Sequence, residues 1–245
     1  MIRPDAPRRR PRRPRASPLD AAAEAARAAG FAPSACAAAP GEVPGLRSET
    51  PAAVLLLAAD GPRTFAAFES SPESEDGAPH PLDRWSRRLA ESLAAVHGAR
   101  AILPFDGPPW PPFLRWASRA EPVWPSRLGP TLHATRGLWA SWRAALAFPD
   151  APAPPPRPDP GPRPCDACAA PCLSACPVSA FAETPEGPRY DADRCAAHVA
   201  SPAGRDCRER GCLARRACPV GAAAVHAPRQ AAFHMAAFLR SRPGG

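Results

Sequence analysis

Eight of the nine cysteines in this chain lie between Cys165 and Cys218, in two groups that each end in Cys-Pro-Val. The first group has the spacing Cys-x2-Cys-x3-Cys-x3-Cys-Pro, and the second group is spaced more widely. The eight residues are Cys165, Cys168, Cys172, Cys176, Cys195, Cys207, Cys212 and Cys218. Two four-iron four-sulfur clusters need eight thiolates, because each cluster takes four cysteine ligands. The sequence therefore predicts a protein that binds two 4Fe-4S clusters.

The proline after the last cysteine of each group predicts how the ligands are shared. In bacterial ferredoxin sequences, the fourth cysteine of a Cys-x2-Cys-x2-Cys-x3-Cys-Pro run binds the other cluster. We therefore expect crosswise ligation with two sets of ligands. The first set is Cys165, Cys168, Cys172 and Cys218, and the second set is Cys176, Cys195, Cys207 and Cys212. Because the cysteines of the second group are irregularly spaced, a single cluster stays open as an alternative.

Other interpretations of the cysteines are also open. Zinc sites use Cys-x2-Cys pairs, although they usually join two such pairs without a Cys-Pro ending. Disulfides are disfavoured in a reducing compartment. His198 lies three residues after Cys195 and could ligate iron, but we expect a surface or packing role for it. Cys36, outside the groups, reads as a small buried residue.

A proline-rich segment divides the chain. Residues 149–164 contain nine prolines in sixteen positions, which predicts a stiff, extended linker. We expect a disordered basic tail (1–16), an N-terminal α/β domain (17–148), this linker, and an iron–sulfur domain with a C-terminal helix (165–245). The expected fold class is α+β.

Hydrophobic patterns predict several elements before and after the linker. Ser17 and Pro18 are typical of a helix start, and Gly30 is typical of a helix end. Further helices are expected over 82–97, 132–148 and 230–240, and strands over 52–59 and 101–105. The segments 70–81 and 106–130 read as loops, and residues 190–195 as a short strand that delivers Cys195.

The charge of the chain says little about partners. The net charge is +8, and residues 1–15 contribute +6 of it with seven arginines and one aspartate. We expect this tail to be solvated; contact with nucleic acid through phosphates stays open. No run of 18 apolar residues and no signal peptide is evident, so we expect a cytoplasmic protein without a membrane partner.

Three stretches of the cysteine region resemble epoxyqueuosine reductases, in the two-cluster ferredoxin domain on their C-terminal side. They read CDACAAPCLSACPVSAF, YDADRCAAHVAS and GCLARRACPVG. HPLDRWSRRLAESLAAV and PSRLGPTLHATRGLWASWRAAL are more weakly similar to the region before that domain. The resemblance implies a ferredoxin-like relative. The family's middle cysteine is absent between Cys212 and Cys218, and the resemblance implies that Cys207, which precedes both, serves in its place; no residue matches the catalytic acid. Cobalamin, which the family holds, is therefore not supported.

These observations lead to three functional hypotheses. The first is an electron-transfer protein that serves a redox partner protein. The second is an oxidoreductase similar to epoxyqueuosine reductase, whose clusters feed a substrate or corrinoid site in the N-terminal domain. The third is a protein whose clusters are structural or sensory. The catalytic residues, if any, are not identifiable from the sequence.

Overall fold

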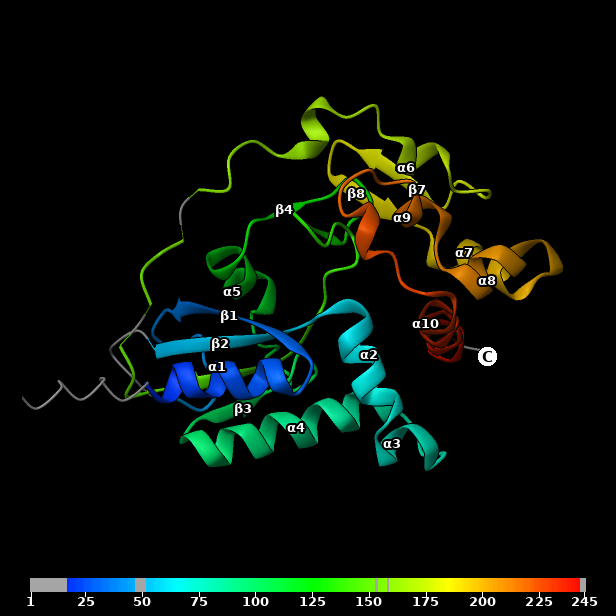
Figure 1. The fold of residues 1–245 in the computed structure, drawn as a ribbon. Coiled ribbons are helices and arrows are strands. Elements are labelled where there is room, and N and C mark those ends of the chain that lie inside the picture. Colours follow the sequence, from blue (N-terminus) through cyan, green and yellow to red (C-terminus); the bar gives the residue numbers. More distant parts are fainter. Residues whose placement is uncertain (1–16, 47–51, 153, 158, 243–245) are drawn as a thin grey trace, which may run out of the picture.

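A four-stranded antiparallel sheet organises the first part of the molecule, residues 17–148, which we call the sheet portion (Figure 1). The computed structural model describes residues 17–46, 52–152, 154–157 and 159–242. The strand order is β1–β2–β6–β3. The strands are β1 (Phe31–Ala38), β2 (Ala52–Ala59), β6 (Trp142–Phe148) and β3 (Arg100–Ile102). The arginine-rich tail lies outside the described residues.

Helices cover both faces of this sheet, which explains why its central strands are apolar throughout. Helices α1 (Pro18–Ala28) and α4 (Pro81–His97) pack on one face, where Leu55 and Leu57 of β2 point. Helix α5 (Phe113–Ala120) packs on the other face, against Val54 and Leu56. Between these elements lie α2 (Gly61–Glu69), α3 (Pro72–Glu75), and a small hairpin of β4 (Val123–Pro125) and β5 (Thr131–His133).

The second part, residues 164–242, consists of short elements and is called the cysteine-rich portion. A hairpin of β7 (Phe181–Thr184) and β8 (Gly187–Tyr190) lies among the α-helices α6 (Pro171–Ser174), α7 (Ala192–Ala200), α8 (Arg205–Arg210), α9 (Leu213–Arg216) and α10 (Pro228–Arg240). Single 3-10 turns occur at Pro164–Ala167, Pro202–Gly204 and Ala222–Ala224. Helix α10 packs on α8 and α7, and its Phe233 also contacts Phe65 and Phe68 of α2. This helix of the cysteine-rich portion therefore lies where that portion contacts the sheet portion (Figure 1).

The proline-rich segment contacts the sheet portion. No helix or strand occurs in its described residues before Pro164. The carbonyl of Gly161 accepts a hydrogen bond from the indole Nε1 of Trp124 at 3.0 Å, and Arg157 donates to the carbonyl of Ser118 at 3.4 Å. The segment is thus held along the surface of β4 and α5.

Several sequence predictions are confirmed. The hydroxyl of Ser17 accepts from the backbone N–H of Asp20 at the start of α1, as a capping residue does. Strand β2 has the expected bounds, and helices α4 and α10 begin within two residues of the expected positions. Strand β3 ends before Pro104, since proline lacks the N–H that a strand needs.

The prediction of a helix over 132–148 is wrong. The residues that suggested it (Leu138, Trp142 and Leu146) lie in a turn and in the central strand β6. Both faces of β6 are covered, so its side chains do not alternate between apolar and polar, and a short apolar run of this kind resembles a buried helix. The segments expected to be loops contain α3, α5 and β4, and β1 was not anticipated. Cys195 lies in α7, not on a strand.

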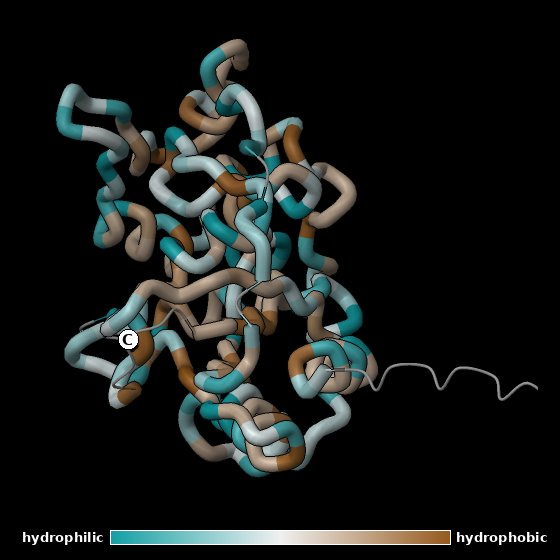
Figure 2. The backbone as a smooth tube through the Cα atoms, turned by 90° about the vertical axis from the view of Figure 1, so that its left-hand side faces the viewer, coloured by the Kyte–Doolittle hydropathy of each residue, from teal (hydrophilic) through white to brown (hydrophobic). Residues whose placement is uncertain are grey.

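The described residues contain no helix that is both long and apolar enough to cross a lipid bilayer. Figure 2 shows the hydrophobic residues in short stretches along the backbone, interrupted by hydrophilic ones.

Candidate metal centre

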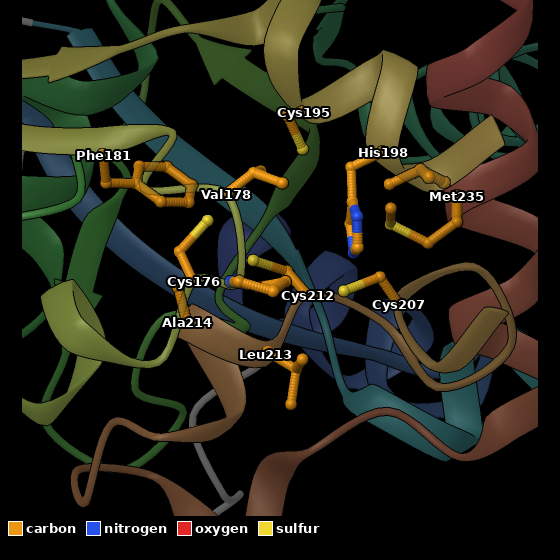
Figure 3. Close-up of a pocket in the computed structure, with 12 residues that line it drawn as sticks. Cys176, Val178, Phe181, Cys195, His198, Cys207, Cys212, Leu213, Ala214 and Met235 are labelled. Atoms are coloured by element: carbon orange, nitrogen blue, oxygen red, sulfur yellow. The ribbon is translucent and has the colours of Figure 1, made fainter. Parts of the chain in front are cut away.

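Four cysteines line one cavity in the cysteine-rich portion (Figure 3). They are Cys176 after α6, Cys195 in α7, Cys207 in α8, and Cys212 at the start of α9. Their sulfur atoms point toward the middle of the view in Figure 3. Apolar side chains of Val178, Phe181, Leu213 and Met235 complete most of the wall. The structure thus brings together the four residues that the crosswise scheme assigns to the second set.

Cys176 reaches this cavity because the chain turns sharply after it. Pro177 follows the end of α6, and Ser179 adopts a left-handed conformation with φ 49°. This turn brings the backbone N–H of Ala180 to the Sγ of Cys176, which accepts a hydrogen bond at 3.3 Å. Hydrogen bonds of this kind stabilise negative charge on sulfur.

The first set gathers at a second place, between α6 and the turn after α9. Cys172 is buried, and burial raises its pKa; the nearby sulfurs of Cys218, Cys165 and Cys168 raise it further. Burial, with the sulfurs of Cys165 and Cys168, likewise raises the pKa of Cys218, against a hydrogen bond from the backbone of Val220. The four cysteines of the first set are therefore electrostatic neighbours. Buried leucines of the sheet portion (Leu128, Leu132 and Leu138) form a cluster with Cys172, and both sets pack against it, through Cys165 and Cys218 and through Cys176 and Cys212.

Burial also raises the pKa values of two thiols of the second set, Cys195 and Cys212. Desolvation is the main cause for Cys195, where the Tyr190 hydroxyl donates a hydrogen bond that opposes the rise and the sulfurs of Cys176 and Cys207 increase it. Desolvation again dominates for Cys212, opposed by the backbone N–H groups of Arg215 and Ala214. Since only the thiolate is a metal ligand, metal binding here has to release protons.

One arginine tests whether these cysteines fit an anionic cluster. The Nε atom of Arg215 is buried and has no hydrogen-bond partner among the described residues, and the charge of Arg215 acts on Cys212. Arg242, whose charge acts on Cys195, is 34% exposed and already forms an ion pair with Asp193 at 3.7 Å. A buried charge is stable only when it is compensated. Four thiolates around an iron–sulfur core carry net negative charge, so the donor set and its surroundings fit this group.

No three histidine, cysteine, aspartate or glutamate residues of the described ranges are arranged to hold a single metal ion. A cubane cluster differs from a single ion, because each of its four thiolates binds a different iron atom. Its ligand sulfurs are consequently farther apart than those around one zinc ion.

Three residues at the site were not anticipated from the sequence. Tyr190 contacts Cys195, Arg215 lies beside Cys212, and Met235 of α10 lines the cavity. Arg215 could have been identified from the sequence, because it follows Cys212 by only three residues. His198, for which we expected a surface or packing role, lines the same cavity (Figure 3). Cys36 is 2% exposed within the sheet core, as expected, and burial raises its pKa to about 11.

A second cavity lies on the other side of α10. It has a volume of about 750 Å³ and is bounded by α10 and by the segment from α3 to the start of α4. Its polar lining includes His80, Arg143, His234 and Arg240. Met235 faces the cysteine cavity, while the adjacent His234 and the nearby Ala237 face this one. One helix, about 10 to 12 Å in diameter, therefore separates the two spaces.

Comparison with known proteins leaves the chain without an assigned family. No family model matches it, and no curated protein matches it. Solved structures of epoxyqueuosine reductases are similar. One, with a stem loop of epoxyqueuosine-modified tRNA-Tyr, has a TM-score of 0.46 and 15% identity, over 86% of this chain and 69% of that one.

A second solved structure, from Bacillus subtilis, has its catalytic loop swung out of the active site. It has a TM-score of 0.45 and 15% identity over 85% of this chain and 67% of that one. A selenomethionine-labelled epoxyqueuosine reductase has a TM-score of 0.45 and 14% identity, over 85% and 66% of the two chains. Because these scores are below 0.5, the functional argument below uses only the residues of this chain.

Proposed function

We propose that this chain is an electron-transfer protein that binds two 4Fe-4S clusters. The first cluster would be held by Cys165, Cys168, Cys172 and Cys218, and the second by Cys176, Cys195, Cys207 and Cys212. The observation that carries the proposal is the crossing of the two groups: Cys176 lies with the cysteines of the second group, and Cys218 lies with those of the first.

When bound, such clusters take up and release single electrons, at potentials between about −700 and +450 mV. The protein's own residues supply the surroundings. Val178, Phe181, Leu213 and Met235 exclude water from the second set. The N–H of Ala180 and the hydroxyl of Tyr190 donate to its sulfurs. No bond to a substrate is needed, so a redox partner protein would supply or accept the electron by docking nearby.

The same proposal assigns a role to each segment of the chain. Residues 165–245 would form the cluster-binding domain, 149–164 the linker, and 17–148 a domain that supports the ligands. The leucine cluster that contains Cys172 and contacts cysteines of both sets favours this supporting role for the sheet portion.

Metal analysis of the full chain tests the proposal. Protein purified without oxygen and reconstituted with iron and sulfide is expected to hold about eight of each per chain. Dithionite should reduce it reversibly, with signals of two clusters in electron paramagnetic resonance. Colourless protein that contains zinc, or no metal, would refute the proposal. Clusters that do not cycle reversibly would indicate a structural or sensory role.

The cavity behind α10 favours one alternative, an oxidoreductase whose clusters feed a bound substrate or corrinoid. Its volume is within the usual range for small-molecule sites, about 300 to 1,000 Å³. It also lies one helix away from the second set. Incubation of the reconstituted protein with cobalamin, followed by gel filtration, separates the two functions. A corrinoid absorbance that co-elutes with the protein would support the alternative, and its absence would favour the electron carrier.

A further inference from the structure

Arg215 holds a buried positive charge beside one of the proposed cluster ligands. Arg215 belongs to α9 and follows Cys212 by three residues in the sequence. The guanidinium stacks on the ring of Trp139, with 4.1 Å between its central carbon and the ring centroid. Its Nη2 donates to the carbonyl oxygen of Leu138 at 2.7 Å, and its buried Nε has no hydrogen-bond partner within the described ranges. The ionisable groups beside it are the sulfur of Cys212 and the imidazoles of His226 and His234.

The arginines near the first set are different, because acidic side chains neutralise them. Arg127 donates to the carbonyl of Cys165 but forms an ion pair with Glu183 at 2.8 Å. Arg163 forms an ion pair with Asp166 at 2.6 Å. Their positive charge is therefore largely cancelled close to its source.

Hydrogen bonds also differ between the two sets. The second set receives bonds from the N–H of Ala180, the hydroxyl of Tyr190, and the backbone N–H groups of Ala214 and Arg215. In the first set, Cys218 receives one from the backbone of Val220, and Cys172 receives one from its own backbone N–H, so the first set receives fewer. Positive charge and donated hydrogen bonds both stabilise the reduced cluster, which carries the larger negative charge.

Burial of Cys212 opposes these effects. A low dielectric disfavours added negative charge, so burial lowers the reduction potential of a cluster bound there. The same low dielectric strengthens the attraction between Arg215 and a nearby negative charge. No acidic side chain in the described part of the chain forms an ion pair with Arg215, so we expect its charge to outweigh the effect of burial.

We propose that Arg215 raises the reduction potential of the second cluster above that of the first, so that a single added electron resides at the second set. This inference rests on the proposed function. An electron that passed from the first site to the second would oxidise the one by one electron and reduce the other by one, with no proton or covalent bond exchanged. Arg215 acts as a tuning residue, and Trp139 as the residue that positions it.

The test is a redox titration of the reconstituted full chain, followed by electron paramagnetic resonance. Arg215→Met removes the charge and keeps much of the side-chain volume. We expect the potential of the second cluster to fall, and the ratio of electron occupancy between the second and first clusters to fall by about tenfold. The first cluster should keep its potential. Arg215→Lys should retain most of the wild-type value, because the charge stays.

Arg205→Met is the matched control, since Arg205 lies on α8 but is exposed and paired with Glu209 at 2.9 Å. It should move neither potential. If Arg215→Met fails to fold, Trp139→Phe loosens the stacking without removing the charge and should lower only the second potential, by less. Equal shifts in both clusters, or no shift, would overturn the inference. Wild-type protein without two cluster signals would instead refute the proposed function.

Discussion

The backbone of Gly137 lies against the carbonyl oxygen of Val220 so closely that a Cβ atom added to Gly137 would be 2.0 Å from that oxygen. The contact is reciprocal, because a Cβ added to Gly221 would be 2.3 Å from the backbone nitrogen of Gly137. Both glycines have positive φ angles, 54° and 72°. The turn after β5 therefore meets the Cys218-Pro219-Val220-Gly221 turn through backbone atoms.

Gly137→Ala is expected to separate these two turns. The added methyl group cannot be accommodated next to a carbonyl oxygen, so the turn that carries Cys218 has to shift. We expect a loss of stability of about 1 to 3 kcal/mol and a loss of iron from the first set before the second. Thermal unfolding and iron content of the reconstituted protein measure both effects.

Gly129→Ala is the control for backbone strain. Gly129 has φ 98°, but an added Cβ would meet no atom within 4 Å. Its variant should show the cost of the positive φ without the steric clash. If both variants unfold at the same temperature and keep the same iron, the contact at Val220 has no role in holding Cys218.

Crosswise ligation predicts opposite effects of two matched substitutions. Cys176→Ala should weaken the signal of the second cluster, because Cys176 lies in the cavity with Cys195. Cys218→Ala should weaken the signal of the first cluster. Electron paramagnetic resonance of the reduced variants distinguishes the two signals, and Cys36→Ala should leave both intact since Cys36 lies in the sheet. Loss of only the first signal in Cys176→Ala would show that the ligation scheme is wrong.

The stability of the protein should decrease in mild acid partly because of His133. Burial, and then the charge of Arg136, lower the pKa of His133 from 6.5 to about 4. Between pH 6.5 and pH 4, His133 therefore binds a proton in the unfolded chain but stays neutral in the folded chain. The contribution of neutral His133 is complete above pH 6.5 and is lost as the pH falls toward 4, with a slope of at most about 1.4 kcal/mol per pH unit.

His133→Asn should reduce this slope. The Nδ1 of His133 accepts hydrogen bonds from the backbone N–H groups of Thr135 and Arg136, both at 3.1 Å, and the asparagine oxygen can replace it as an acceptor. The difference in unfolding temperature between wild type and variant should change in favour of the variant between pH 7 and pH 4. Parallel curves for the two proteins would contradict the assignment to His133.

Local signals made part of the fold predictable. Ser17 and Pro18 specify a helix start whatever lies around them, and the apolar stripe of α4 needs only one buried face. Strand β6 was misread because its apolar run reflects burial on both faces, which is a property of the assembled sheet. Strand β1 contains Pro33 and four alanines, so little in its composition favours a strand.

In the candidate site, too, some features are predictable from the sequence and others depend on the folded structure. Cysteine spacing and the two Cys-Pro endings predict the two ligand sets without any knowledge of the fold. Arg215 and Trp139 are far apart in the sequence, and only folding brings the indole under the guanidinium. Sequence spacing cannot reveal such a pair, because neither residue belongs to the cysteine pattern.

The position of α10 limits how this protein could be divided or recombined. Phe233 packs on both phenylalanines of α2, while Met235, two residues later, lines the cavity of the second set. A fragment cut at the proline-rich segment would leave Phe65 and Phe68 uncovered in one piece and Phe233 uncovered in the other. The cysteine-rich portion is therefore not an interchangeable module: to graft it onto another protein, a designer would have to supply a substitute for the surface of α2.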